Sequence, residues 1–289
     1  MKTIAVIGAG TMGNGIAHTF ARFGYTVTLI DVSVPQLEKA VQTIQKNLGR
    51  QVEKGIISVE QKESAMKNIS TNTSIAVGVK GADLVIEAAS ENAELKLKIF
   101  KEMDEYAPDS AILATNTSSI SITRIASATK RPGKVIGMHF MNPVPVMTLV
   151  EIINGYATEG AVTESIADLA RRIEKTPCVV NDYPGFVANR ILMPMINEAI
   201  FSKYEGVAGV EEIDTVMRLG MAHPMGPLQL ADFIGLDVCL AILKVLHEGF
   251  GNPKYSPCPL LVNMVTAGKL GVKSGEGFYK YKDGKPIAP

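Results

Sequence analysis

The sequence predicts an α/β protein with a doubly wound sheet in its first part and a smaller all-helical domain after it. Over residues 1–183, short apolar runs alternate with longer amphipathic stretches, which is typical of strands that alternate with helices. After the turn-forming segment at residues 181–185, the strand pattern ends and only helical patterns follow. We therefore expect two domains, at residues 1–183 and 184–289.

Short apolar runs predict the buried strands of the first domain. These runs lie at residues 4–7, 27–30, 84–86, 111–114, 135–139, 147–153 and 178–180. Amphipathic stretches between them predict helices, for example at residues 12–23, 95–106 and 162–174. In the second domain, helical patterns cover residues 186–204, 210–219, 227–248 and 259–267. The apolar content of these helices indicates helix–helix packing and a homodimer interface.

The composition argues against several classes of function. The 289 residues include 29 Lys plus Arg and 29 Asp plus Glu, so a net charge of zero gives no overall attraction to nucleic acid or to an anionic membrane. No apolar run approaches the ~20 residues that a membrane-spanning helix needs. The three cysteines are far apart, lack metal-ligand spacing and fit a reducing compartment. Because the chain also enters its first strand directly, we expect a cytoplasmic protein without a metal site, a nucleic-acid partner or a membrane anchor.

A glycine-rich turn follows the first predicted strand. Residues 8–13 read Gly-Ala-Gly-Thr-Met-Gly, a G-x-G-x-x-G pattern that here opens a helix, as it does in a Rossmann-type dinucleotide site. Gly8 permits the tight turn, and Gly10 lets the backbone approach a pyrophosphate. Gly13 allows the helix and the strand to pack closely. The pattern therefore predicts a dinucleotide site at this turn.

The helix start and one carboxylate complete the predicted dinucleotide site. The free N–H groups at the helix start, where Thr11 and Met12 lie, favour the phosphates together with the helix dipole. Asp31 ends the second predicted strand, where a carboxylate accepts hydrogen bonds from both ribose hydroxyls. It would also repel a 2′-phosphate, so we expect NAD as the cofactor and NADP as the less favoured one. The alternative is an ordinary glycine turn with a capping Asp.

Of the four histidines, His139 has the most informative position, because it ends a predicted strand and precedes a proline-rich turn. Ligands of open α/β sheets bind at the carboxyl ends of strands. Glu151 follows 12 residues later within an apolar run, where a carboxylate needs a partner. The turn at residues 142–146 can fold the second strand back and bring Glu151 to the imidazole. Such a pair suits a base that removes a hydroxyl proton while hydride leaves the same carbon, and the alternative is a structural ion pair.

Two further polar residues lie where a substrate could meet them. Ser118 follows the strand at residues 111–114 and either donates a hydrogen bond to a substrate oxygen or, like Thr117, caps the next helix. Asn189 lies early in the first helix of the second domain. It faces either a cleft between the domains or solvent.

Several stretches of the chain match a known family from residue 4 to about residue 280. They lie at residues 8–13, 87–92, 116–119, 138–147, 184–186, 189–190, 224–227 and 275–279, and they include Met138-His139-Phe140-Met141-Asn142-Pro143-Val144-Pro145. With these motifs the whole chain resembles the short-chain L-3-hydroxyacyl-CoA dehydrogenases, in particular the bacterial 3-hydroxybutyryl-CoA dehydrogenases. The spacing from histidine to glutamate is especially specific to that family.

The resemblance implies roles for individual residues. His139 would be the general acid/base, Glu151 would orient it, and Ser118 and Asn189 would position the 3-oxygen of the thioester substrate. Residues at positions where the family contacts NAD are Glu91, Lys96, Ser118, Asn142 and Lys273. By analogy the enzyme would act on the (3S) alcohol of a 3-hydroxyacyl-CoA, with acetoacetyl-CoA as the oxidised partner, and would form a homodimer through its helical domain.

A basic stripe adds to this interpretation. Lys46, Arg50 and Lys54 are spaced by four residues and therefore share one helix face. This stripe either meets the phosphates of CoA or is a solvated basic face, and the family resemblance implies the CoA contact for Lys54.

Two other functions remain as alternatives. An NAD-binding structural or sensor protein of the same fold would need none of Ser118, His139, Glu151 and Asn189. A related β-hydroxyacid dehydrogenase that acts on a small sugar acid would depend on a catalytic lysine, by resemblance to that family. The pair of His139 and Glu151 argues against the second alternative.

Overall fold

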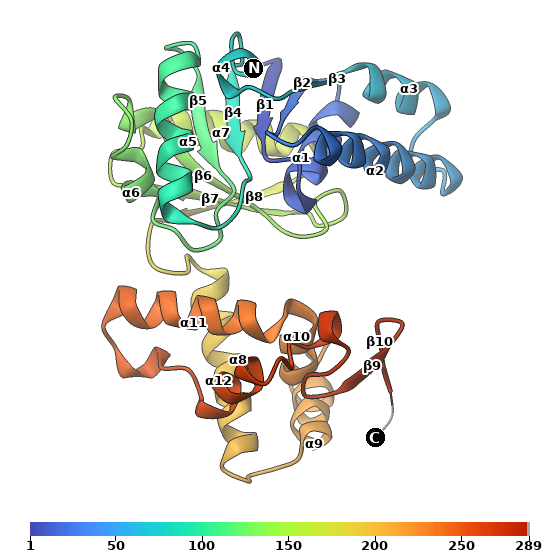
Figure 1. The fold of residues 1–289 in the computed structure, drawn as a ribbon, viewed down its shortest axis with the longest axis vertical. Coiled ribbons are helices and arrows are strands. Elements are labelled where there is room, and N and C mark those ends of the chain that lie inside the picture. Colours follow the sequence, from blue (N-terminus) through green and yellow to red (C-terminus); the bar gives the residue numbers. More distant parts are fainter. Residues whose placement is uncertain (288–289) are drawn as a thin grey trace. The chain divides into compact units, whose positions relative to one another are not determined.

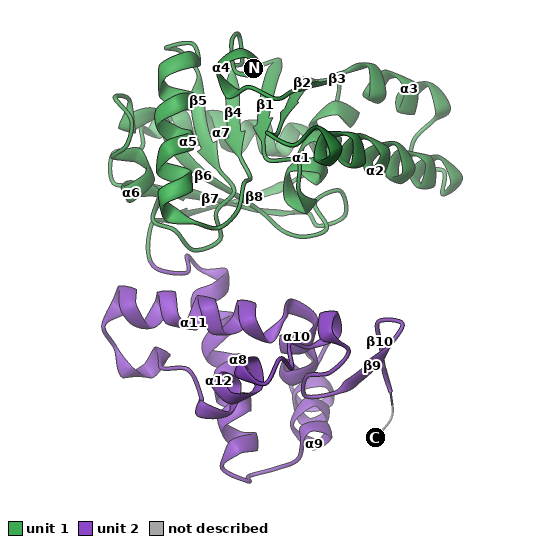
Figure 2. Cartoon of the chain, viewed as in Figure 1, with its two compact units in different colours: residues 1–183 green, residues 184–289 purple. Residues whose placement is uncertain are grey.

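The computed structural model describes residues 1–287, which form two compact units (Figure 1 and Figure 2). The first unit covers residues 1–183, and the second begins at Pro184. Within residues 1–287, none of the helices has the combination of length and hydrophobicity that crossing a bilayer demands.

The first unit is an eight-stranded sheet with helices on its faces. Its strands are β1 (Thr3–Ile7), β2 (Thr26–Ile30), β3 (Ile69–Asn72), β4 (Leu84–Glu87), β5 (Ile112–Thr115), β6 (Val135–Phe140), β7 (Leu149–Asn154) and β8 (Thr176–Asn181). Its helices are α1 (Thr11–Arg22), α2 (Val34–Glu53), α3 (Val59–Lys67), α4 (Ile75–Gly78), α5 (Ala93–Tyr106), α6 (Ile122–Ala126), the 3-10 turn η1 (Pro132–Lys134) and α7 (Gly160–Arg172). The predicted α/β class is confirmed.

The strand order is β3-β2-β1-β4-β5-β6-β7-β8. All neighbouring strands run parallel except β6 and β7, which run antiparallel. Apolar side chains of α1, α2 and α7 form one core with the sheet. The chain moves outward in one direction from β1 to β3 and in the other from β4 onward, so a topological switch point lies between β1 and β4. Ligands of such sheets bind at the carboxyl ends of the strands next to this point.

One strand and the helices α3 and α4 were not foreseen from the pattern. The strand β3 has the sequence Ile-Ser-Thr-Asn, and it lies at the edge of the sheet with its middle residues exposed. Because an edge strand needs little apolar surface, it gives no apolar run for a pattern search to find. The predicted strand at residues 147–153 begins two residues later, at Leu149.

The second unit consists mainly of helices around its own core. Its elements are α8 (Ala188–Tyr204), α9 (Val210–Thr215), the π-helical segment η2 (Val216–Gly220), α10 (Pro227–Ile234), α11 (Leu236–Phe250), the 3-10 turn η3 (Pro253–Tyr255), α12 (Pro259–Thr266), the 3-10 turn η4 (Val272–Ser274), β9 (Lys280–Lys282) and β10 (Lys285–Ile287). The helical domain is confirmed, and the short hairpin of β9 and β10 is an addition to the expected all-helical unit.

The single helix expected at residues 227–248 is wrong in one respect, because the chain forms two helices there. Gly235 has a φ of 105°, which interrupts the helix between α10 and α11. The apolar pattern continues through this glycine, so the periodicity alone did not reveal the break. The helix expected at residues 210–219 likewise changes to π-helical geometry at Val216.

Two buried carboxylates fix the C-terminal end of the second unit. Asp232 accepts hydrogen bonds from the backbone N–H groups of Phe278 and Tyr279, each at 2.9 Å. Asp214 accepts one from the hydroxyl of Tyr279, also at 2.9 Å. A Cβ atom on Gly277 would lie 1.9 Å from an Asp232 oxygen, so this position accepts only glycine. The motif at residues 275–279 is therefore explained by packing within this unit.

Candidate active site

The glycine-rich turn has the geometry that a pyrophosphate needs. Gly8 has a φ of 98°, and a Cβ atom there would lie 2.6 Å from the carbonyl oxygen of Ala88. A Cβ atom on Gly13 would lie 1.7 Å from the carbonyl oxygen of Gly8, so α1 packs directly on the turn. A Cβ atom built on Gly10 would have no other atom within 4 Å. Gly10 is the N-cap residue of α1, and no side chain caps the start of this helix. The N–H groups of the first turn of α1 are therefore available to an anion.

A pocket of 490 Å³ lies beside this turn, at the carboxyl ends of β1, β2 and β4. Its lining includes Gly8, Gly10, Asp31 and the segment 88–90. Asp31 accepts hydrogen bonds from the backbone N–H groups of Ala9 at 2.8 Å and Ser33 at 3.0 Å. Each carboxylate oxygen can accept a further hydrogen bond, so these residues fit the ribose and pyrophosphate of a dinucleotide.

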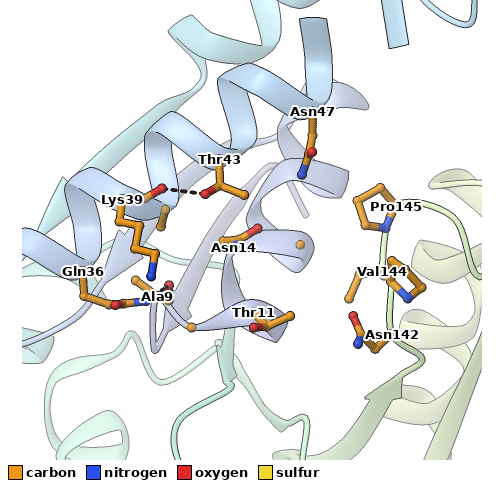
Figure 3. Close-up of a pocket in the computed structure, with 14 residues that line it drawn as sticks. Ala9, Thr11, Asn14, Gln36, Lys39, Thr43, Asn47, Asn142, Val144 and Pro145 are labelled. Carbon is orange, nitrogen blue, oxygen red and sulfur yellow. Dashed lines mark hydrogen bonds between the residues drawn. The ribbon is translucent and has the colours of Figure 1, made fainter. Parts of the chain in front are cut away.

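A second pocket, of 280 Å³, lies on the other side of Gly10 (Figure 3). One wall is the face of α2 that carries Lys39, Thr43 and Asn47, and the opposite wall is the loop at residues 142–145. The side chain of Lys39 extends from α2 toward Ala9 (Figure 3). The sequence analysis did not single out these three α2 residues. Their spacing of four residues is the same spacing that identified Lys46, Arg50 and Lys54 on this helix.

The imidazole and the carboxylate predicted to form a pair lie together. His139 on β6 is the register partner of Glu151 on β7. The Nδ1 atom of His139 lies 2.7 Å from the Oε2 atom of Glu151. The Glu151 side chain is 3% exposed and that of His139 is 11% exposed. The expected fold-back of the chain between these strands is confirmed, and it leaves the imidazole slightly exposed while the carboxylate is buried.

The end of the His139 strand is held by a residue that sequence reasoning left without a role. The backbone N–H of Phe140 donates a 2.9 Å hydrogen bond to Oδ1 of the buried Asn116. Strands β5 and β6 pair only as far as Thr115 and Gly137. The Asn116 side chain thus continues the connection between the two strands to the residue next to His139. The position of Asn116 in the sequence, directly after a predicted strand and next to Ser118, could have indicated this role.

A network of charges connects the sheet interior with the loop that carries Ser118. Glu87 and Lys96 are almost completely buried, and the Lys96 Nζ lies 2.6 Å from Oε1 of Glu87 and 3.4 Å from Oε2 of Glu91. The other Glu87 oxygen accepts a 2.7 Å hydrogen bond from the Thr115 hydroxyl. The ammonium group of Lys96 is therefore neutralised by two carboxylates of the protein.

Glu91 gathers the loop at residues 117–119. Its Oε1 atom accepts hydrogen bonds from the backbone N–H of Ser118 at 2.9 Å, from the Ser118 hydroxyl at 3.3 Å and from both donors of Ser119 at 3.1 Å. Burial disfavours the charged form and is the largest single effect, but Lys96 and the hydrogen bonds together outweigh it and lower the pKa of Glu91. The next helix, α6, is capped by Ser121, so neither Ser118 nor Thr117 is its N-cap. The Thr117 hydroxyl instead accepts hydrogen bonds from the backbone N–H groups of Ser119 and Ile120 within the loop.

The other predicted site residues lie outside these two pockets. Lys46, Arg50 and Lys54 are exposed on or directly after α2, beyond the pocket-lining residues of that helix. Asn189 lies in the first turn of α8 and is 9% exposed, so it does not face solvent. In the second unit, the Lys273 Nζ donates a 2.6 Å hydrogen bond to Asp237. Met12 is half-buried against the core of the first unit.

Comparisons with known proteins match the whole chain. Residues 3–183 match the family model described as the NAD binding domain of 3-hydroxyacyl-CoA dehydrogenase, and residues 185–281 match the model of its C-terminal domain. The chain is 52% identical to a 3-hydroxybutyryl-CoA dehydrogenase of Bradyrhizobium diazoefficiens over 99% of its own length and 98% of that protein. It is 43% identical to the human mitochondrial hydroxyacyl-coenzyme A dehydrogenase, with 98% of this chain and 92% of that protein covered.

A solved structure has the same fold. The (S)-3-hydroxybutyryl-CoA dehydrogenase PaaH1 from Ralstonia eutropha superposes with a TM-score of 0.95 at 47% identity, and the match covers 98% of this chain and 100% of that one.

Proposed function

Because this chain belongs to the 3-hydroxyacyl-CoA dehydrogenase family, we propose that it interconverts (3S)-3-hydroxybutyryl-CoA and acetoacetyl-CoA with His139 as the acid/base. The chain is an NAD-dependent oxidoreductase of this family. The observation that carries the proposal is the 2.7 Å contact between His139 and Glu151.

The proton transfer follows from that contact. When bound, the nicotinamide ring takes up or releases the hydride at C3 of the substrate. In oxidation, neutral His139 removes the proton of the 3-hydroxyl through Nε2, because Nδ1 faces Glu151. Glu151 fixes the tautomer and stabilises the imidazolium that forms. In reduction, His139 returns the proton to the 3-oxygen.

Positioning falls to polar groups around this pair. Ser118 and Asn189 hold the 3-oxygen in our proposal, and Glu91 supports this role by fixing the Ser118 loop. The cofactor binds along Gly8, Gly10, Thr11, Met12 and Gly13, and the ribose hydroxyls bind Asp31. Further cofactor contacts come from Glu91, Asn142 and Lys273, and the buried Lys96 supports the cofactor site through its ion pair with Glu91.

The CoA part of the substrate lies along α2 in this proposal. Lys46, Arg50 and Lys54 follow Lys39, Thr43 and Asn47 at intervals of seven residues and therefore continue the same helix face. This face begins at the 280 Å³ pocket and carries positive charge, which suits the phosphates of CoA. We expect Lys54→Ala to raise the KM for acetoacetyl-CoA several-fold and to leave the KM for NADH unchanged.

NAD is preferred over NADP because of Asp31. Its carboxylate lines the ribose pocket, where a 2′-phosphate would meet a second negative charge. Replacement by Asn removes the charge and keeps the shape. We expect Asp31→Asn to narrow the ratio of kcat/KM for NADH over NADPH at least tenfold. An unchanged ratio in the variant would contradict this role.

The second unit offers a surface for a homodimer. Ile191 on α8, Leu219 on η2 and Phe233 on α10 are each at least two-thirds exposed. Exposed apolar side chains that form one contiguous patch mark association surfaces, and we propose that these three belong to one such patch. We expect light scattering to give twice the chain mass, and a Phe233→Asp variant to shift toward monomer.

The cysteines support a cytoplasmic location in our proposal. All three are free thiols, as is usual for proteins in a reducing compartment.

The reaction itself is tested by following NADH oxidation with acetoacetyl-CoA and by identifying the stereochemistry of the product. The proposal requires turnover and formation of the (3S) alcohol. A protein that binds NADH but turns over no 3-oxoacyl-CoA would instead be a sensor of the same fold. Turnover of small hydroxy acids without affinity for acetoacetyl-CoA would support the β-hydroxyacid dehydrogenase alternative.

A further inference from the structure

The loop between β6 and β7 forms one wall of the 280 Å³ pocket. Asn142, Val144 and Pro145 of this loop face the pocket opposite α2 (Figure 3). The strand pairing on either side fixes His139 and Glu151, but the pairing ends at Phe140 and Val150. The shape of the loop must therefore be set by other contacts.

One of these contacts comes from a buried lysine on a distant segment. The Lys175 side chain donates a 2.6 Å hydrogen bond to the carbonyl oxygen of Val144 and a 2.7 Å hydrogen bond to that of Met147. Lys175 is only 8% exposed. None of the ion pairs found within residues 1–287 includes it. Two loop carbonyls thus take the place of the carboxylate that a buried ammonium group usually has.

The local sequence turns Lys175 toward the loop. Helix α7 ends at Arg172, and Glu174 then adopts a φ of 57°, which reverses the chain. The backbone N–H of Lys175 donates a 2.9 Å hydrogen bond to the carbonyl oxygen of Ala170 and closes this turn. The next residue, Thr176, donates to the carbonyl oxygen of Thr148 at 2.8 Å, so the backbone beside Lys175 is also attached to the far end of the loop.

The opposite side of the loop packs on α1. A Cβ atom on Gly15 would lie 2.9 Å from the Cβ of Val144, so helix and loop are in close contact there. Val144 is itself buried. The loop is therefore held between α1 on one side and the Lys175 ammonium group on the other, and both contacts act at Val144.

Burial of the charged ammonium group of Lys175 costs free energy. Burial is the main cause that lowers the pKa of Lys175, and the nearby Arg22 lowers it further while Glu174 opposes both. A methionine of similar length would fill the same space without that cost. The ammonium group offers what methionine lacks, which is three N–H donors that reach two carbonyls at once.

We propose that Lys175 is a positioning residue that holds the loop at residues 142–147 in the shape of the wall of the 280 Å³ pocket. It acts through the carbonyls of Val144 and Met147, and it takes no part in the proton transfer at His139. The inference rests on the proposed binding of NAD at the glycine-rich turn, because Gly10, Thr11 and Asn142 share this pocket.

The test measures binding separately from chemistry. The affinity for NADH is determined by fluorescence titration, and the amide hydrogen exchange of residues 142–148 is followed in the protein without ligand. We expect Lys175→Met to weaken NADH binding about tenfold and to speed exchange at Val146 and Met147, whose N–H groups bond to the carbonyl of Pro143. The pH profile of kcat should stay in place, because the strand register that pairs His139 with Glu151 is unchanged.

A matched control is Lys134→Met, since Lys134 also donates to a carbonyl, that of Asp109 at 2.7 Å, but in an exposed position. This control should keep wild-type affinity and exchange. Lys175→Arg keeps the charge and the N–H donors, so it should bind NADH more tightly than Lys175→Gln. This comparison of the two affinities tests the proposal even if the Met variant does not fold. Equal affinities for Arg and Gln, or a folded Met variant with wild-type affinity and exchange, would overturn the proposal. Wild-type protein that fails to bind NADH would instead refute the proposed cofactor site.

Discussion

Two histidines of the first unit, His139 and His18, differ in their exposure and in their hydrogen-bond partners. His139 lies at the end of β6, is partly accessible and has the Glu151 carboxylate 2.7 Å away. His18 lies in α1 and is fully buried, and within residues 1–287 neither of its ring nitrogens has a hydrogen-bond partner. Burial lowers the pKa of His18 to about 4; the Gln51 side chain has the next largest effect and raises it, while Arg22 and Lys175 lower it. His18 is therefore neutral at pH 7.

The contrast teaches that the partner and the access decide what a histidine can do. A carboxylate behind the imidazole stabilises the protonated form, and partial exposure of the ring lets a substrate approach it. His139 has both features, and His18 has neither. A buried imidazole without a partner acts as a packing group whose protonation opposes folding.

The largest effect should come from removal of the His139 imidazole. We expect His139→Gln to lower kcat by roughly 10²- to 10⁴-fold, because general acid/base catalysis contributes about that much. NADH affinity should stay unchanged, since the glycine-rich turn and Asp31 are untouched. Steady-state kinetics with acetoacetyl-CoA and fluorescence titration with NADH provide the two measurements. Turnover near the wild-type rate would remove His139 from the mechanism.

A smaller effect should follow when only the partner is changed. Glu151→Gln keeps the shape and removes the charge, so the imidazolium is no longer stabilised. We expect kcat to fall by roughly 10- to 100-fold, by analogy with the loss of partners that orient metal-bound histidines. The pH profile of kcat should also move, which a purely structural ion pair would not cause. An unmoved profile at reduced stability would favour the structural alternative.

The contribution of His18 should appear in stability at acid pH. The unfolded chain protonates this histidine below about pH 6.5, whereas the folded protein resists until about pH 4. Acid therefore favours unfolding, and the free energy of unfolding should fall by about 2 kcal/mol between pH 7 and pH 5 through this residue alone. His18→Gln should remove this part of the pH dependence in urea unfolding. His247→Gln, which changes a histidine near the surface, should keep it.

The smallest effect should be that of His18 on catalysis. We expect His18→Gln to keep kcat within about twofold of wild type at pH 7, because a neutral buried side chain is replaced by another neutral one. The same assay as for His139 gives the answer. A large loss of turnover with intact stability would show that the two histidines are coupled, and the contrast between them would then fail.

Much of the site could be predicted from local patterns. The apolar runs gave the strands of the sheet, and the glycine spacing gave the turn at Gly8 and Gly10. The proline-rich turn after His139 was enough to suggest that Glu151 returns beside it. These predictions share one physical basis, because strand alternation, tight turns and hairpin-like returns depend on residues that are close in sequence.

Other features depended on segments that meet only in the folded chain. Nothing near Lys175 in sequence indicates that its ammonium group ends at the carbonyls of Val144 and Met147, some 30 residues earlier. The same is true of the hydrogen bond from Phe140 to Asn116 and of the lack of a partner at His18. The sequence by itself determined the class of fold, the dinucleotide turn and the pairing of His139 with Glu151. Only the tertiary structure decided which polar groups find partners, because that depends on how distant elements pack and not on local periodicity.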